Sequence, residues 1–205
     1  MLIAALTGGI ASGKSIIADI LEELGCYIHH ADSVAHQLME PEKPAWKAIV
    51  DHFGPNILNP DRTINRQRLG ATVFANSKER AFLNNLIHPL VMQKKKDIIT
   101  QLRQNKTHKI FVSEAALTIE AGYADFFDKI IVAYCPRDTQ IDRLMKRDKI
   151  DKDEALKKIE SQLSPETKLE YADYVIDTSG TIKETIEQSE RVFRNLLMDY
   201  EQICS

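Results

Sequence analysis

The feature that most constrains the fold is a glycine-rich segment of eight residues near the start of the chain. Residues 8–15 read Gly-Gly-Ile-Ala-Ser-Gly-Lys-Ser and match the phosphate-loop pattern G-x-x-x-x-G-K-[ST] in full. An apolar run at residues 2–6 precedes the segment, and from Lys14 onward apolar residues recur at helical spacing. A strand, a glycine turn and a helix in this order favour an α/β protein with a parallel sheet.

Each part of this motif has a physical reason. Glycine lets the backbone turn tightly, so that several N–H groups can face one anion. A helix that begins at Lys14 adds unpaired N–H groups and the positive end of its dipole. Lys14 can bridge the β- and γ-phosphates of a nucleotide, and the hydroxyl of Ser15 can coordinate Mg²⁺. The flanking strand and helix argue against a chance glycine turn, so the sequence predicts phosphate binding.

The rest of the chain continues the alternation of strands and helices. Apolar runs that suit buried parallel strands occur at residues 26–29, 110–112, 130–133 and 174–176. Helical patterns follow them, which predicts a doubly wound sheet of five parallel strands. Residues 40–104 contain helical patterns and no convincing strand, which indicates an inserted helical lobe.

Composition excludes several classes of protein. The 205 residues include 27 Lys and Arg against 30 Asp and Glu, without the basic excess typical of proteins that bind duplex nucleic acid. The three cysteines form no C-x-x-C pair, so neither a zinc site nor a disulfide framework is indicated. No apolar run approaches the roughly 20 residues that a membrane span requires. We therefore expect a cytoplasmic protein that binds neither nucleic acid nor a membrane.

Three classes of protein share the phosphate loop. A GTPase needs the guanine-reading motif N-K-x-D, and its nearest equivalent, residues 105–108, reads Asn-Lys-Thr-His and lacks the aspartate. A motor or remodelling ATPase usually needs a longer chain. A small kinase needs a base for the acceptor hydroxyl, a lid that carries arginines, and an acceptor pocket.

Three residues are candidates for these kinase functions. Asp32 follows the second predicted strand, and the carboxyl ends of such strands face the ligand crevice. Its carboxylate can accept a proton or hold a Mg²⁺ water, although it can also serve only the helix dipole. Arg143 and Arg147 are four residues apart and share a helix face, where they can neutralise phosphoryl charge or form a solvated face with Asp138 and Asp142.

Taken together, these motifs resemble those of dephospho-CoA kinases, the enzymes of the last step of coenzyme A synthesis. The resemblance spans about residues 2–198 and rests on the order and spacing of its segments. These segments are residues 6–15 (LTGGIASGKS), 30–32 (HAD), 64–66 (INR), 69–70 (LG), 73–74 (VF), 87–91 (IHPLV), 120–122 (EAG), 139–147 (TQIDRLMKR), Gln162 and 172–180 (ADYVIDTSG).

The resemblance implies an α/β P-loop kinase that uses ATP and Mg²⁺ to phosphorylate the ribose 3′-hydroxyl of dephospho-CoA. It implies one kinase domain, with a five-stranded core at about 1–39, 105–147 and 170–205, a helical acceptor lobe at about 40–104 and a helical lid at about 143–168. Asp32 would be the base, with Lys14 and Arg143 as further catalytic residues and Ser15 as the metal ligand. We expect a monomer.

The resemblance also implies two sets of binding residues. The expected contacts of ATP are Gly8, Gly9, Ile10, Ala11, Ser12, Gly13, Lys14, Ser15, Ile16, Arg147 and Thr178. The expected contacts of dephospho-CoA are Asp32, Arg66, His88 and Glu114.

The chain departs from the family pattern at several positions. Ala11 stands where glycine is usual, and it permits the loop if its φ is negative. Ile16 replaces threonine, and Thr178 replaces asparagine on the adenine side. Residues 113–117 read Ser-Glu-Ala-Ala-Leu in place of D-x-P-L-L, so Glu114 stands where aspartate is usual. Two alternatives stay open: another small-molecule kinase, such as a nucleoside monophosphate kinase, and a nucleotide sensor without turnover.

Overall fold

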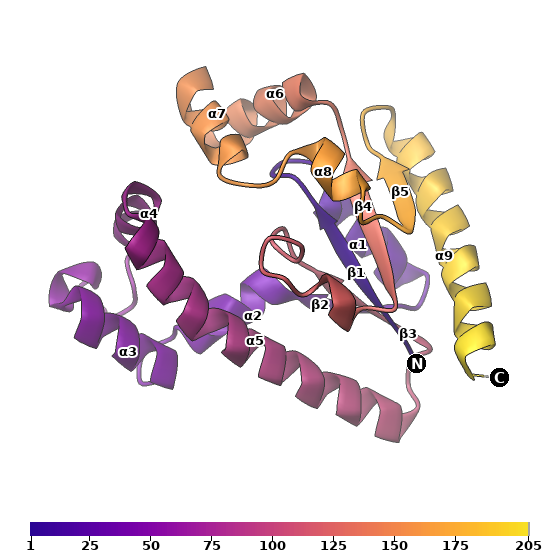
Figure 1. Ribbon diagram of the computed structural model, residues 1–205, viewed down its shortest axis with the longest axis horizontal. Helices are drawn as coiled ribbons and strands as arrows, with labels where there is room; N and C mark the ends of the chain where they lie inside the picture. Colours follow the sequence, from indigo (N-terminus) through magenta and orange to yellow (C-terminus); the bar gives the residue numbers. More distant parts are fainter. Residues whose placement is uncertain (205) are drawn as a thin grey trace. The chain divides into compact units, whose positions relative to one another are not determined.

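The computed structural model describes residues 1–204, apart from the side chains of Phe74 and Cys204, and contains one parallel sheet (Figure 1). Its five strands lie in the order β2-β3-β1-β4-β5. The strands are β1 (Leu2–Gly8), β2 (Tyr27–His30), β3 (Ile110–Glu114), β4 (Lys129–Tyr134) and β5 (Tyr174–Asp177). The predicted five-stranded parallel sheet is therefore confirmed.

The register of the sheet gathers the carboxyl ends of the strands at one edge. Glu114 at the end of β3 is opposite both His30 on β2 and Leu6 on β1. On the other side of β1, Gly8 is opposite Ala133 on β4. The phosphate loop therefore leaves the central strand at the edge where ligands of such sheets bind.

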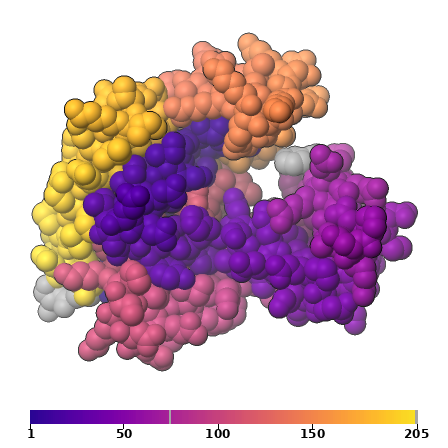
Figure 2. Space-filling model, turned by 180° about the vertical axis from the view of Figure 1, so that it is seen from behind, coloured from indigo at the N-terminus to yellow at the C-terminus, as the bar shows by residue number. Residues whose placement is uncertain are grey.

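The main hydrophobic core lies on the sheet face that α1 (Lys14–Glu23) and α9 (Ile182–Cys204) cover. Every residue of β1 is buried, as expected for a central strand covered on both faces. Helix α9 packs along α1, and Figure 2 shows its yellow side chains beside the indigo N-terminal segment. The buried core residues include Leu2, Leu6, Ile17, Leu21, Ile131, Ile176 and Leu196.

Three helices follow β4 in the region predicted to be the lid. These are α6 (Arg137–Asp148), α7 (Lys152–Glu160) and α8 (Pro165–Leu169), and a short 3₁₀ turn, η2 (Ala124–Phe126), precedes β4. Helices α6 and α7 share a small apolar cluster of Ile141, Leu144, Ala155 and Ile159. The side chains of Ile10 and Ala11 pack against this cluster, so the phosphate loop is in contact with these helices.

The contact pattern divides the chain into two units, residues 1–30 with 102–205 and residues 31–101. The second unit contains α2 (Ala31–Leu38), α3 (Pro44–Phe53), η1 (Pro55–Ile57), α4 (Arg66–Ala75) and most of α5 (Ser77–Asn105), which continues through Pro89. It begins before the expected boundary near residue 40 because Ala35 and Met39 pack into its core with Trp46 and Ile49. Among the described residues, no helix combines the length and the apolar character that crossing a bilayer requires.

Candidate active site

Two glycines of the phosphate loop occupy positions that a side chain would disrupt. A Cβ atom at Gly8, whose φ is 151°, would collide with the carbonyl oxygen of Ala133 and lie 2.7 Å from Ser12 Oγ. Gly13 has a φ of 83°, and a Cβ atom added to it would lie 3.2 Å from the side chain of Thr178. Helix α1 begins directly after Gly13, so the first N–H groups of a helix open onto the loop.

The ammonium group of Lys14 folds back over the loop. Its Nζ donates to the carbonyl oxygens of Gly8 at 3.2 Å and Gly9 at 2.9 Å. These two hydrogen bonds hold the charge beside the loop, where oxygens of a bound phosphate would be further acceptors. The structure thus places this ammonium group at the loop, and its phosphate-binding role stays a prediction.

Ala11 has a left-handed backbone conformation. Its φ is 58°, so the condition of a negative φ, under which an alanine was expected to permit the loop, is not met. An L-residue in this region loses about 1–2 kcal/mol through the close approach of Cβ to the backbone. The conformation is held by its surroundings, because Ile10 and Ala11 pack against α6 and α7.

Ser15 and Glu114 meet at the strand ends. The Ser15 hydroxyl donates to Glu114 Oε1 at 3.4 Å, and His30 Nδ1 lies 2.5 Å from Glu114 Oε2. Hydroxyl and carboxylate oxygens are ligands that Mg²⁺ prefers, so the donor set here fits that ion. Ser15 was predicted as the metal ligand and Glu114 as a contact of the acceptor, and the partner role of His30 was not predicted. Ile16, the next residue on α1, is 41 % exposed.

Thr178 connects Arg143 to the phosphate loop. Its hydroxyl lies 2.9 Å from the carbonyl oxygen of Ser12 and accepts a hydrogen bond from Arg143 Nη1 at 3.1 Å. Arg143 Nη2 also donates to the Thr178 carbonyl oxygen at 2.5 Å. The structure thus brings Arg143, Thr178 and the loop together, and the buried threonine side chain faces the loop.

Arg147 has a different environment from Arg143 although both lie on α6. Its side chain is 57 % exposed and pairs with Asp148, with Nε and Oδ1 2.7 Å apart. Lys158 donates to the same carboxylate at 2.9 Å. The hydrogen bonds from Arg147 and Lys158 lower the pKa of Asp148 to about 2. The ion pair of Arg147 is therefore with Asp148, and not with Asp138 or Asp142, the partners named in the alternative of a solvated helix face.

Asp32 lies in the first turn of α2, two residues after the end of β2. Its side chain is exposed, and its charge acts on His36 one turn later in the helix. Burial and the positive charge of Arg66 lower the pKa of His36, and the negative charge of Asp32 opposes them. The aspartate therefore belongs to the same electrostatic environment as Arg66, which the sequence analysis assigned to the acceptor.

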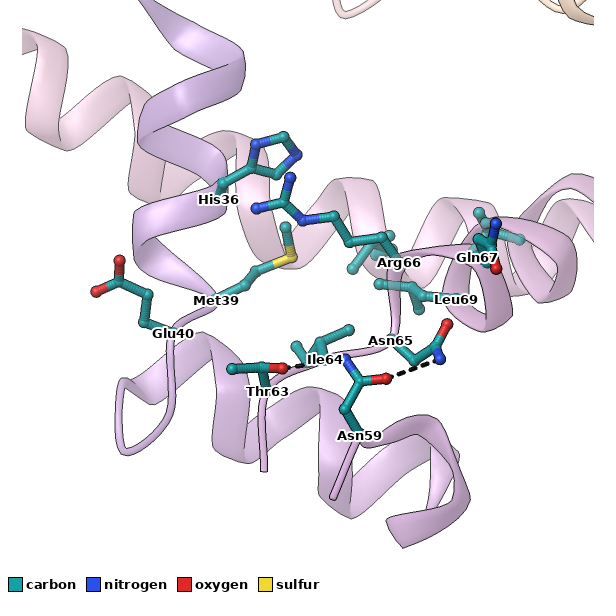
Figure 3. A pocket seen from close by; sticks show the side chains of 13 residues that line it. His36, Met39, Glu40, Asn59, Thr63, Ile64, Asn65, Arg66, Gln67 and Leu69 are labelled. Atoms are coloured by element: carbon teal, nitrogen blue, oxygen red, sulfur yellow. Dashed lines mark hydrogen bonds between the residues drawn. The ribbon is translucent and has the colours of Figure 1, made fainter. Parts of the chain in front are cut away.

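Within residues 31–101, Arg66 and His36 line a pocket of about 590 Å³ (Figure 3). The side chains of Met39, Ile64, Leu69, Val73 and Leu83 give it an apolar lining. Asn65 donates to Asn59 at 2.8 Å on its polar side. This volume and this mixture of side chains suit a small organic ligand. His88 lies on α5, half-buried with its pKa lowered by desolvation, and is not among the described residues that line the pocket.

Four further residues hold the loop or its neighbours, and the sequence analysis assigned none of them to the site. A Cβ atom at Gly9 would lie 2.7 Å from Nε2 of the buried Gln140. Gln162 accepts a hydrogen bond from the N–H of Ile10 at 2.9 Å. Lys168 is fully buried and pairs with Glu120 at 2.7 Å. Gln140, Gln162 and Glu120 lie in the segments that resemble the family, and this could have identified them as site residues. Lys168 lies in a charged stretch that is typical of a solvated surface, so no sequence signal identified it.

Comparison with known proteins gives consistent matches over this chain. Residues 2–184 match the model of a family described as dephospho-CoA kinase. The chain is 39 % identical over 197 residues to the dephospho-CoA kinase of Syntrophus aciditrophicus, covering 96 % of this chain and 84 % of that protein. It is 42 % identical over 187 residues to that of Halalkalibacterium halodurans, covering 91 % and 92 %.

A solved structure supports the same relationship. The dephospho-CoA kinase from Campylobacter jejuni superposes with a TM-score of 0.69 and 28 % sequence identity. The match covers 95 % of this chain and 96 % of the other. It therefore includes the sheet, the phosphate loop and the helical insertion.

Proposed function

The chain belongs to the dephospho-CoA kinase family, and from this premise we propose how its own residues carry out the family's reaction. The enzyme phosphorylates dephospho-CoA at the expense of ATP, the final step of coenzyme A biosynthesis. The observation that carries the assignment of roles is the contact of Lys14 and Arg143 with one phosphate loop, Lys14 directly and Arg143 through Thr178.

Lys14 and the N–H groups of the loop hold the phosphates of ATP. Charge spreads over the oxygens of the transferred phosphoryl group in the transition state, and positioned cations stabilise it most at that stage. Arg143 supplies a second cation, and Thr178 aligns its planar guanidinium. Arg147, Ile16 and the remaining loop residues complete the nucleotide site.

Asp32 acts as the base that accepts the proton of the ribose 3′-hydroxyl. This role is supported by the position of Asp32, which follows a strand that ends at the ligand-binding edge of the sheet and lies exposed in the first turn of α2. A carboxylate there can take a proton from an acceptor without the cost of a buried charge.

Ser15 and Glu114 would hold Mg²⁺, since their oxygens lie within hydrogen-bond distance of each other beside the loop. The ion supplies neutralisation of the β- and γ-phosphate charge when it is bound. His30 keeps the Glu114 carboxylate oriented through its second oxygen.

The acceptor occupies the pocket of the helical unit. Arg66 faces His36 there and provides positive charge for a phosphate-bearing ligand, while the apolar side chains pack against its uncharged part (Figure 3). His88 contributes from α5. We place the enzyme in the cytoplasm, because Cys26 and Cys135 are free thiols, as is usual in a reducing compartment. We also propose that it acts as a monomer.

The test is release of ADP from ATP with dephospho-CoA as acceptor, followed by detection of a 3′-phosphorylated product. Nucleoside monophosphates and dephospho-CoA that lacks the 3′-hydroxyl are the control acceptors. We expect turnover with dephospho-CoA and at least a 100-fold loss in Lys14→Ala. Equal turnover with nucleoside monophosphates, or ATP binding without turnover, would contradict the assignment.

A further inference from the structure

The side chain of Gln162 reaches the phosphate loop from the segment between α7 and α8. Its Oε1 accepts a hydrogen bond from the N–H of Ile10 at 2.9 Å, across 152 residues of sequence. Backbone N–H groups of this loop are the groups that receive phosphate. The N–H of Ile10 is instead engaged by Gln162, which fixes the direction of the Gly9–Ile10 peptide group within the loop.

The bond lies beside the strained part of the loop. Ala11, the next residue, has a φ of 58°, a conformation that alanine adopts only when its surroundings impose it. Three contacts of this segment supply such constraints. They are the packing of Ile10 and Ala11 on the α6–α7 cluster, the turn closed by the N–H of Ser12 on the Gly9 carbonyl oxygen at 3.2 Å, and the Gln162 bond to Ile10.

The backbone next to Gln162 is anchored by the ion pair of Lys168 and Glu120. The N–H of Leu163 donates to Glu120 Oε1 at 3.0 Å, and Lys168 Nζ pairs with the same oxygen at 2.7 Å. Lys168 also donates to the carbonyl oxygen of Ala116 at 2.6 Å. Thr7, the residue before the loop, donates to that carbonyl oxygen at 3.2 Å. This series of hydrogen bonds therefore connects Gln162, through Glu120 and Lys168, back to the start of the phosphate loop.

We propose that Gln162 is a positioning residue whose carboxamide, anchored by the Lys168–Glu120 pair, holds the loop in the left-handed form at Ala11 that receives nucleotide phosphates. This inference rests on the assignment of residues 8–15 as the nucleotide site. Loss of the Gln162 bond lets the loop relax at Ala11. The fraction of protein that can bind nucleotide then falls, and the apparent affinity falls with it.

The experiment uses Gln162→Met, which keeps the length and volume of the side chain but removes the acceptor, and measures ADP affinity by titration calorimetry without turnover. We expect the dissociation constant to rise about tenfold, which corresponds to about 1.4 kcal/mol. The KM for ATP should rise more than kcat falls, since bound nucleotide itself restores the loop. Hydrogen exchange of residues 9–12 should become faster in the protein without nucleotide.

A second substitution distinguishes positioning from general support of the fold. Ala11→Gly removes the conformational penalty at φ 58°, so it should return the ADP affinity of Gln162→Met to within about threefold of wild type. A loss of packing or of global stability would not be restored by this change. Gln104→Met makes the same replacement at an exposed glutamine and should leave the affinity as it is.

Two results would overturn the proposal. One is a Gln162→Met protein with wild-type ADP affinity and loop exchange, and the other is weakened affinity that Ala11→Gly does not restore. Failure of the wild-type protein to bind ADP would instead overturn the nucleotide site, and this proposal with it. A rescued double variant supports the positioning role.

Discussion

Replacement of Lys168 by methionine should destabilise the protein through the charge that it leaves behind. Lys168 is fully buried, and its partner Glu120 has a side chain that is only 18 % exposed. The second oxygen of Glu120 is buried without a hydrogen bond, so the ammonium is the main compensation for that carboxylate. Removal of one partner of a buried pair costs about 3–5 kcal/mol. The partial exposure of Glu120 places the expected loss near the lower value, about 3 kcal/mol.

The magnitude can be measured by thermal and urea unfolding followed by circular dichroism. For a chain of this length, each kcal/mol lowers the midpoint by about 2–4 °C, so the expected decrease is about 6–12 °C. Lys158→Met is the matched control, since that lysine forms a more exposed pair with Asp148 and should cost at most about 1 kcal/mol. Adding Glu120→Gln to Lys168→Met should recover much of the loss, because the amide oxygen still accepts from Leu163 without carrying charge.

The reasoning would be refuted by a Lys168→Met protein that unfolds at the same midpoint as Lys158→Met. That result would mean that water reaches the Glu120 carboxylate in the folded protein. A double variant less stable than Lys168→Met would equally contradict the explanation, because it would assign the loss to packing and not to an unpaired charge.

Three further predictions concern chemistry and pH. Asp32→Asn should lower kcat at least 100-fold, since asparagine cannot accept the proton, while ATP affinity measured by calorimetry should change less than about threefold. Equal losses in kcat and in ATP affinity would reassign Asp32 to a binding role. Arg143→Lys should lower kcat about as much as Arg143→Ala in steady-state assays, because the two hydrogen bonds to Thr178 require the two nitrogens of a planar guanidinium group. A lysine variant with wild-type kcat would contradict the catalytic role of Arg143. Stability should decline as pH falls below about 6.5, because desolvation lowers the pKa of His36 and His88 from that value and the unfolded chain therefore takes up their protons first. Urea midpoints between pH 8 and pH 5 should show this decline, and it should be smaller in His88→Gln.

Sequence patterns predicted the sheet and the loop because both depend on local order. The motif at residues 8–15 occurs between a strand and a helix, and each remaining strand is a short apolar run bounded by polar residues. The position of Glu114 beside Ser15 needed more than local order, because the two residues are 99 apart in sequence and meet through the pairing of β1 with β3.

The residues that support the loop were not predictable in the same way. The contact of Gln162 with Ile10 and the pairing of Lys168 with Glu120 join segments that no periodicity relates. The loop was expected to permit Ala11 at a negative φ, yet the φ is 58° and the side chain packs against the α6–α7 cluster. Tertiary contacts overrode local preference at this position.

The order of strands in the sheet has a consequence for the way the chain folds as it is synthesised. Strand β1 is central, but both of its neighbours, β3 and β4, come after residue 109. At a translation rate of about 5–20 residues per second, the fully buried β1 waits on the order of ten seconds for them. The most apolar strand is thus the first of the five to leave the ribosome and remains without both partners until much of the chain has followed. The helical unit of residues 31–101 can form its own core during that interval, which shortens the effective loop between β2 and β3 and favours their pairing.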